Sequence, residues 1–121
     1  MTPQTLHGLK IAENFNENLA QLPRYDDVAR LDLFRLNGDL VGCIENKPGQ
    51  AGSTRVYAWL NQVFGSIDPT AAQYGLKIYA EHTLDAQSYP DKHPNIDRLL
   101  RIKVEEDTLH VKAIFKSTAF L

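Results

Sequence analysis

Asn37-Gly38 separates two apolar runs, VARLDLFRL and DLVGCIEN, and so limits how the first half of the chain can fold. Asn-Gly is the strongest short-range signal for a two-residue hairpin turn, because both residues tolerate the positive φ that this turn requires. We therefore predict an antiparallel hairpin from Val28 to Asn46. Its expected cross-strand pairs are Leu31–Ile44, Leu33–Gly42, Arg35–Leu40 and an ion pair between Arg30 and Glu45.

Capping residues predict helices on both sides of this hairpin. Asn14 or Asn16 is placed to cap a short helix near the N-terminus. After the hairpin, Ser53 is a good N-cap for a helix over residues 54–64, and Gly65 stands where a C-cap glycine belongs. Apolar residues at helical spacing along the second segment predict that one of its faces is buried.

The second half of the chain shows weaker signals. Asp68-Pro69 predicts another helix start, because a cap is followed by proline at the first helical position. Gly75 is expected to end that helix. Alternating apolar and polar residues over 76–81 then predict a strand, and Pro94 is expected to begin one helical turn.

The C-terminal part predicts a second hairpin, in which LRIKVEE pairs with LHVKAIF around Asp107-Thr108. Its expected pairs are Leu100–Phe115, Ile102–Ala113 and Val104–Val111. The predicted fold class is α+β: a mainly antiparallel sheet built from two hairpins and a middle strand, with two or three helices on one face. A length of 121 residues suits a single domain spanning 1–121, in which residues 1–13 are expected to be a loosely held arm.

Composition narrows the functional classes. Thirteen basic and fifteen acidic residues give a formal net charge of -2, without the basic stripe that phosphate contacts require, so we expect no nucleic-acid partner. No apolar run approaches the roughly 20 residues of a membrane helix, and the N-terminus carries no secretory signal. The single Cys43 suits a reducing compartment. These observations predict a soluble cytoplasmic protein without a membrane partner.

The segment 79–99, YAEHTLDAQSYPDKHPNIDRL, is predicted to be a long polar loop, and such loops often carry binding or catalytic groups. Its histidines and carboxylates suit three roles: a mixed nitrogen and oxygen metal site, acid–base chemistry, or capping and turning of the backbone alone. No motif such as H-E-x-x-H decides among them. The candidate residues of this polar-loop site are Glu81, His82, Asp85, Asp91 and His93.

A second candidate lies in ENKPGQAGS, which joins a predicted strand to a predicted helix. Such a loop can direct backbone N–H groups at an anion, with the helix dipole adding to the attraction. The glycine spacing is not that of a nucleotide-binding P-loop, and an ordinary tight turn with an N-cap is the simpler explanation. The candidate anion-binding residues are Lys47, Gly49, Gly52, Ser53 and Arg55.

Two blocks of the sequence, ENKPGQAGSTRVY and YAEHTLDAQSYPDKHPNIDRLL, resemble those of a family of small bacterial proteins catalogued as a domain of unknown function. The resemblance spans most of the chain, from the first hairpin to the last predicted one. It implies a bacterial, cytoplasmic protein. The family has no established activity, so the resemblance transfers no catalytic residues.

The function expected from these features is that of a non-catalytic binding or regulatory protein that acts through a protein partner or a small anionic ligand. The alternative is a small enzyme, such as a hydrolase, that uses His82 and His93 as acid–base or metal residues. That alternative requires the two polar segments to meet in one cleft. A third interpretation is a protein that neutralises a partner, as a toxin antidote does. The sequence indicates no cofactor, and it allows a homodimer without requiring one.

Overall fold

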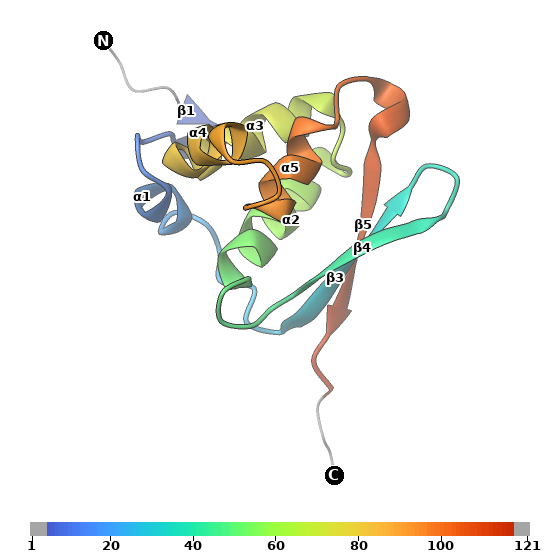
Figure 1. Cartoon of the computed structure of the whole chain (residues 1–121). Helices are drawn as coiled ribbons and strands as arrows, with labels where there is room; N and C mark the ends of the chain where they lie inside the picture. The colour runs from blue at the N-terminus through green and yellow to red at the C-terminus, as the bar shows by residue number, and fades with distance from the viewer. Residues whose placement is uncertain (1–4, 118–121) are drawn as a thin grey trace.

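In the computed structural model, which describes residues 5–117, the helices gather on one side of a small antiparallel sheet (Figure 1). This confirms the predicted α+β class. The elements in chain order are β1 (Thr5–Leu6), β2 (Leu9–Lys10), α1 (Phe15–Leu19), β3 (Val28–Arg35), β4 (Leu40–Glu45), α2 (Ala51–Phe64), α3 (Pro69–Tyr79), α4 (Glu81–Ser88), α5 (Pro94–Leu100), a 3-10 helix (Glu105–Asp107) and β5 (Leu109–Phe115).

The predicted hairpin is present as β3 and β4. The pairs Arg30–Glu45, Leu31–Ile44 and Leu33–Gly42 are all confirmed as neighbours across the strands. The predicted ion pair between Arg30 and Glu45 is wrong, because Arg30 pairs with Asp32 and Glu45 pairs with Lys47. Near the turn the prediction is wrong, because Phe34, not Arg35, pairs with Leu40. The connection is a longer loop in which the Arg35 N–H donates to the Asp39 carbonyl at 2.9 Å and Gly38 takes a φ of 95°. A type I turn followed by a left-handed glycine shifts the register by one residue in this way.

The predicted second hairpin is wrong. The sheet has the order β4-β3-β5, so β5 pairs with β3 and lies far along the chain from its partner. Residues 100–106, expected to be the other strand, form the end of α5, an irregular segment and the start of the 3-10 helix instead. The alternation of apolar residues in this segment does not indicate a strand. Leu99, just before the segment, and Ile102 are buried against the helices. The observed partners of β5 include Arg30–Ile114, Leu31–Ala113, Leu33–Val111 and Arg35–Leu109.

Helix α2 begins earlier than predicted. Gln50 occupies the N-cap position and Ser53 lies within the helix, so its predicted role as the cap is wrong. The predicted C-cap is confirmed, since Gly65 is left-handed with a φ of 81° and its N–H donates to the Asn61 carbonyl. Asp68 caps α3 as predicted, accepting the Ala71 N–H at 2.8 Å.

Helix α3 runs through Gly75, which was expected to end it. The segment 76–81, predicted to be a strand, is the end of α3, the connecting Ala80 and the first residue of α4. The glycine serves packing. A Cβ at this position would lie 2.8 Å from Leu60 Cδ1 and 2.8 Å from Leu99 Cδ1, far inside van der Waals contact. The missing side chain therefore lets α3 approach both α2 and α5 closely.

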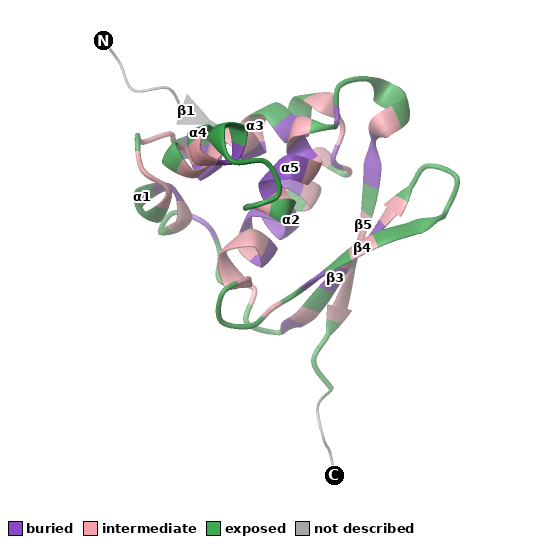
Figure 2. Ribbon diagram, viewed as in Figure 1, coloured by how far each residue is buried: buried purple, intermediate pink, exposed green. Residues whose placement is uncertain are grey.

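Helix α2 lies at the centre of the molecule and contacts all three strands of the main sheet as well as α3 (Figure 1). The buried residues follow this layering (Figure 2). Trp59 belongs to the core, as does Leu9 in the small β1–β2 ribbon. The first residues of the segment predicted to be a loosely held arm lie outside the described range. No helix among residues 5–117 is long and apolar enough to cross a membrane.

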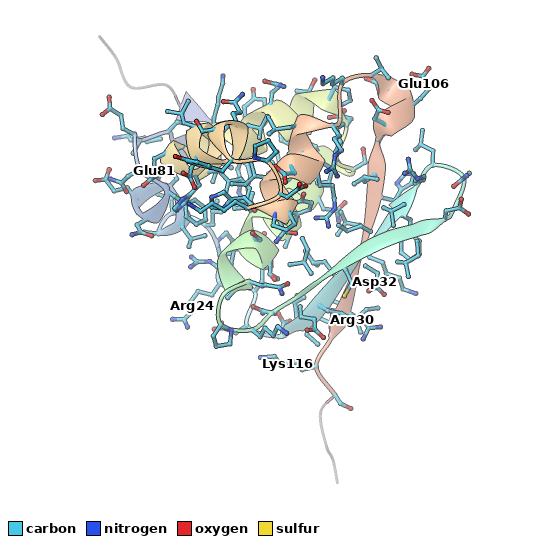
Figure 3. The ribbon with its side chains drawn as sticks, in the orientation of Figure 1. Arg24, Arg30, Asp32, Glu81, Glu106 and Lys116 are labelled. Atoms are coloured by element: carbon cyan, nitrogen blue, oxygen red, sulfur yellow. The ribbon has the colours of Figure 1, made fainter. Side chains whose placement is uncertain are left out.

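The face of the sheet turned away from the helices carries both charged and apolar side chains. Arg30 and Asp32, two residues apart on β3, form an ion pair of 3.0 Å there (Figure 3). Their neighbours Leu31 and Leu33 point to the other face and are fully buried. This alternation is what a sheet with one covered face requires.

Candidate functional site

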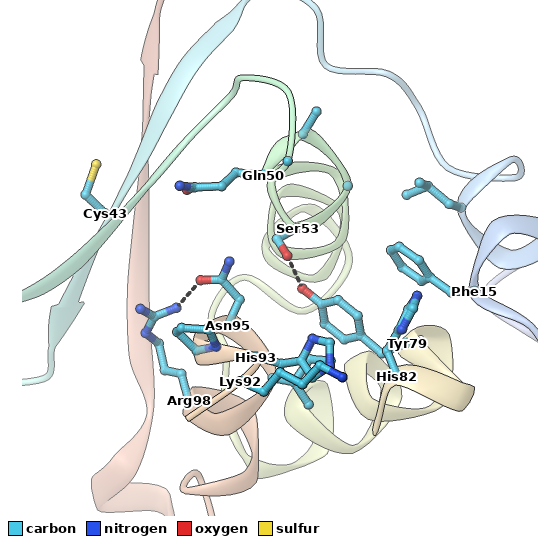
Figure 4. A pocket seen from close by; sticks show the side chains of 16 residues that line it. Phe15, Cys43, Gln50, Ser53, Tyr79, His82, Lys92, His93, Asn95 and Arg98 are labelled. Carbon is cyan, nitrogen blue, oxygen red and sulfur yellow. Dashed lines mark hydrogen bonds between the residues drawn. The ribbon is translucent and has the colours of Figure 1, made fainter. Parts of the chain in front are cut away.

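A cleft of about 590 Å³ lies where the start of α2 faces α4 and α5, with α1 forming a further wall (Figure 4). Both polar segments singled out from the sequence reach it. Gly49, Gly52 and Ser53 come from the first segment, and His82 and His93 come from the second. The other polar or aromatic side chains that line it include Phe15, Tyr79, Lys92, Asn95 and Arg98.

The polar segment itself is not the long loop that was predicted. Residues 81–88 form α4 and residues 94–100 form α5, leaving a short turn with a left-handed Asp91 between them. His82 therefore lies in a helix and does not end a strand. Pro94 begins α5 as predicted, at the first helical position.

One wall of the cleft is aromatic. Phe15 stacks on Tyr79 with ring centroids 5.2 Å apart and planes at 18°. His82 meets Phe15 edge to face at 5.3 Å, and its ring lies 5.7 Å from that of His93. Aromatic pairs in such geometries restrict one another's rotamers and stabilise by about 0.5–1.5 kcal/mol. The wall is therefore rigid in comparison with an open surface.

Two buried tyrosines hold the floor in place. The Tyr79 hydroxyl donates to Ser53 Oγ at 2.7 Å, which joins α3 to the first turn of α2. The Tyr57 hydroxyl donates to the Asn95 carbonyl at 2.6 Å, which joins α2 to α5. Burial raises the pKa of Tyr79 and raises that of Tyr57 to about 12, so both stay neutral donors at physiological pH.

His93 is oriented by a carboxylate. Its Nε2 lies 2.6 Å from Asp85 Oδ2, and Lys92 Nζ lies 2.8 Å from the same oxygen. Hydrogen bonds from Lys92 and then His93 lower the pKa of Asp85. Lys92 and His93 line the cleft, whereas Asp85 lies behind them and is not among the lining residues. The carboxylate therefore fixes the two basic groups without itself facing a ligand.

Arg98 projects into the cleft from α5. Its Nη1 donates to Asn95 Oδ1 at 2.8 Å, and the guanidinium lies 5.8 Å from the centroid of the Tyr57 ring. It passes under strand β4 at Gly42, where a Cβ would lie 3.1 Å from Arg98 Nη2. The glycine thus gives the guanidinium room between the strand and the helix.

Four predicted site residues have other partners. Glu81 Oε1 accepts the Phe15 N–H at 2.6 Å, and Asp91 donates its backbone N–H to Asp97 Oδ2 at 3.0 Å. Lys47 forms a 2.8 Å ion pair with Glu45. Arg55 donates to the carbonyls of Leu19, Leu22 and Pro23 and so closes the end of α1. In the described part of the chain, no group of three or more His, Cys, Asp or Glu residues is arranged to hold a metal ion.

Sequence reasoning missed Lys92, Asn95 and Arg98 as site residues. A signal existed for the arginine, since a glycine inside a strand often marks a close approach by another group. Cys43, on strand β4, is exposed and also lines the cleft. Partial desolvation and the neighbouring Asp32 raise the pKa of its thiol, which argues against a nucleophilic role.

Ala80 connects the helices that carry Tyr79 and His82, and it does so in a strained conformation. Its φ of 52° and ψ of −116° suit glycine, and in other residues such conformations cost about 1–3 kcal/mol. We expect Ala80→Gly to raise the free energy of unfolding by about 1 kcal/mol, after the entropy cost of glycine is deducted. Urea unfolding followed by circular dichroism measures this change.

The control is Gln73→Gly, at an exposed position with ordinary helical geometry in α3. It should lower the free energy of unfolding by about 1 kcal/mol, the usual penalty for glycine in a helix. Equal losses in both variants would show that Ala80 is not strained.

Comparisons with known proteins support the resemblance found in the sequence. A search of curated proteins found no match, and neither did a search of solved structures. A family model described as "uncharacterized protein conserved in bacteria" (DUF2322) matches residues 15–113. This range begins at α1 and ends within β5. It therefore includes all the residues that line the cleft. The chain therefore belongs to this family of uncharacterized bacterial proteins.

Proposed function

We propose that the protein binds a small anionic ligand in the cleft between α2 and α5 and acts as a non-catalytic binding or regulatory protein in the bacterial cytoplasm. The observation that carries this proposal is the charge of the lining. Lys92, Arg98 and two histidines line the cleft, and none of the aspartates or glutamates among residues 5–117 does. A cleft with basic groups of this kind attracts anions and rejects cations.

The basic groups are held in place before any ligand arrives. Arg98 is fixed by Asn95 and by the Tyr57 ring, and Lys92 and His93 are fixed by Asp85. Preorganised donors lose little conformational entropy on binding, so more of their interaction energy contributes to affinity. Arginine is also suited to bidentate contacts with carboxylate or phosphate.

The start of α2 adds to the attraction. Gly52 and Ser53 lie in the first turn of this 14-residue helix and line the cleft. The N–H groups of a first helical turn have no partner within the helix, and the dipole places partial positive charge there. Gly52 also packs against Phe15, where a Cβ would lie 3.3 Å from the ring. The helix end and the aromatic wall therefore meet in one place.

The test is isothermal titration calorimetry, preceded by thermal unfolding against a panel of carboxylates, phosphates and nucleotides. A true ligand at about a hundred times its Kd should stabilise the fold by about 2.7 kcal/mol. Replacing either cleft cation, as Lys92→Gln or Arg98→Gln, should weaken binding by about tenfold or more, the loss expected for one charge-assisted hydrogen bond.

Lys112→Gln is the matched control, because Lys112 is an exposed lysine on β5 and does not line the cleft. It removes the same charge from the molecule and should leave Kd within about twofold. A panel without any stabilising ligand would refute the proposal. So would an equal loss of affinity in the control, since net charge alone would then explain binding.

An enzyme is the second candidate, and the oriented histidine favours it. The Asp85–His93 contact of 2.6 Å is the arrangement in which a carboxylate positions a general base. The variant His93→Gln separates the two functions. A binding protein should lose affinity only, whereas an enzyme should lose turnover of any substrate that the panel identifies.

A further inference from the structure

A second cavity, of about 340 Å³, shares Arg98 with the cleft. Arg35 and Arg101 line it together with Arg98, and apolar side chains such as Val41 and Ile102 complete the wall. We propose that this cavity binds a phosphate group, free or esterified to a small molecule, through these three arginines.

The arginines that line this cavity differ from the others in their partners. Of the six in the chain, Arg24 and Arg30 form ion pairs with aspartates, and Arg55 is used on three backbone carbonyls. The remaining three are the ones that line the cavity. Within residues 5–117, none of them forms an ion pair with a carboxylate. Their charges are available to an anion.

Separate elements of the fold bring these three arginines together. Arg98 and Arg101 are three residues apart at the end of α5, so they lie on one side of it. Arg35 comes from the end of β3, at the hairpin loop. Basic residues in the last turn of a helix often only complement its dipole. That explanation covers Arg98 and Arg101 but gives no reason for Arg35.

The cavity contains one carboxylate, and its contacts are already made. Asp107 Oδ2 accepts the backbone N–H groups of Lys103 and Val104, each at 3.1 Å. These hydrogen bonds, with a further contribution from Arg35, lower the pKa of Asp107, so it is ionised at neutral pH. Three guanidinium groups against one carboxylate leave the cavity strongly positive, which a phosphate dianion would balance.

Phosphate is the anion that this geometry favours. A guanidinium presents a planar set of donors that matches two oxygens of a phosphate, and several arginines can share its three or four oxygens. The inference does not rest on the proposed function of the cleft. Only Arg98 is common to both sites, so its replacement is avoided in the test.

The experiment is a titration of the full chain followed by two-dimensional NMR of backbone and arginine Nε–H groups. The probes are inorganic phosphate and phenyl phosphate, with sodium chloride at matched ionic strength as the reference. We expect both phosphates to shift the Nε–H signals of Arg35 and Arg101. Arg35→Gln and Arg101→Gln should each raise Kd by about tenfold or more, while Lys92→Gln should leave it unchanged.

Lys103→Gln is the control, since Lys103 is exposed near this region but does not line the cavity. Binding of inorganic phosphate but not phenyl phosphate would support a site for the free ion, and binding of both would support an esterified ligand. Shifts of the same size with sodium chloride, or a loss in Lys92→Gln instead of Arg101→Gln, would overturn the proposal. If a glutamine variant does not fold, Arg101→Lys serves in its place. Lysine keeps the positive charge but lacks the planar donor set of the guanidinium, so this variant should also bind phosphate more weakly.

Discussion

Replacing Asn18 by alanine is expected to lower the free energy of unfolding by about 3 kcal/mol. Asn18 is fully buried in α1 and joins two distant backbone segments. Its Oδ1 accepts the Ala12 N–H at 2.6 Å, and its Nδ2 donates to the carbonyls of Ala12 at 3.1 Å and Ile78 at 3.0 Å. Alanine would leave these buried or partly buried backbone groups without hydrogen-bond partners. Each unsatisfied group costs about 1–3 kcal/mol.

The matched control is Asn16→Ala, two residues earlier in the same helix. Asn16 is exposed, so the change should stay within about 0.5 kcal/mol. Urea unfolding of both variants measures the difference. A loss below about 1 kcal/mol for Asn18→Ala would mean that water replaces the amide. Because α1 supplies Phe15 and Leu19 to the cleft, a variant that folds should also bind the cleft ligand less tightly.

The second large effect is expected at Gly75, where a leucine should cost about 3 kcal/mol or more. Both Leu60 and Leu99 are fully buried, and the Cβ alone would lie 2.8 Å from each. The rest of the leucine side chain could be accommodated only if α3 moved away from α2 and α5. Alanine is the sharper test of the cause, because its effect has opposite signs for a glycine that only weakens the helix and for a glycine that permits close packing.

If Gly75 only weakened the helix, Gly75→Ala would stabilise the protein by about 1 kcal/mol. Close packing predicts a net loss instead, since overpacking costs about 1–3 kcal/mol. Lys77→Leu controls for an added apolar side chain, because Lys77 is exposed on the same helix. Stabilisation by alanine at position 75 would therefore disprove the close contact between the helices.

Features with local causes could be predicted from the sequence. The Asn37-Gly38 turn placed the β3–β4 hairpin and most of its register, because the signal and its consequence lie within a few residues. The caps at Asp68 and Gly65 were predicted for the same reason, and Asn14 is one of the two residues proposed to cap α1. Each is a hydrogen bond or a backbone conformation that depends on one side chain and its neighbours.

Features that depend on distant partners could not be predicted in this way. Gly75 was interpreted as a helix end, because nothing in the local sequence shows that Leu60 and Leu99 press against it. The apolar residues at 100, 102 and 104 alternate as a strand does, although the true partner of β5 is β3. Residues 81–88 form a mostly exposed helix with a weak apolar face, which explains why they resembled a loop.

The candidate site shows the same division. The two polar segments were identified separately, yet whether they meet depends on how α2, α4 and α5 pack. The role of Arg98 follows from its contact with Gly42. These residues lie on different elements, α5 and β4, and no local sequence pattern connects them. Five of the ten predicted residues line the cleft. The others form hydrogen bonds or ion pairs that stabilise the surrounding helices and loops.

The strand order β4-β3-β5 has a consequence for how the chain folds. β3 can pair with β4 as soon as a short loop closes, but its pairing with β5 must wait until α2 to α5 lie between them in compact form. Closing so long a loop is entropically unfavourable until the helices have packed, and such non-local pairing slows folding. Until β5 arrives, one edge of β3 exposes unpaired backbone groups, a template for association with other chains. Residues 109–115 thus complete the sheet and end the period in which the folding chain is open to aggregation.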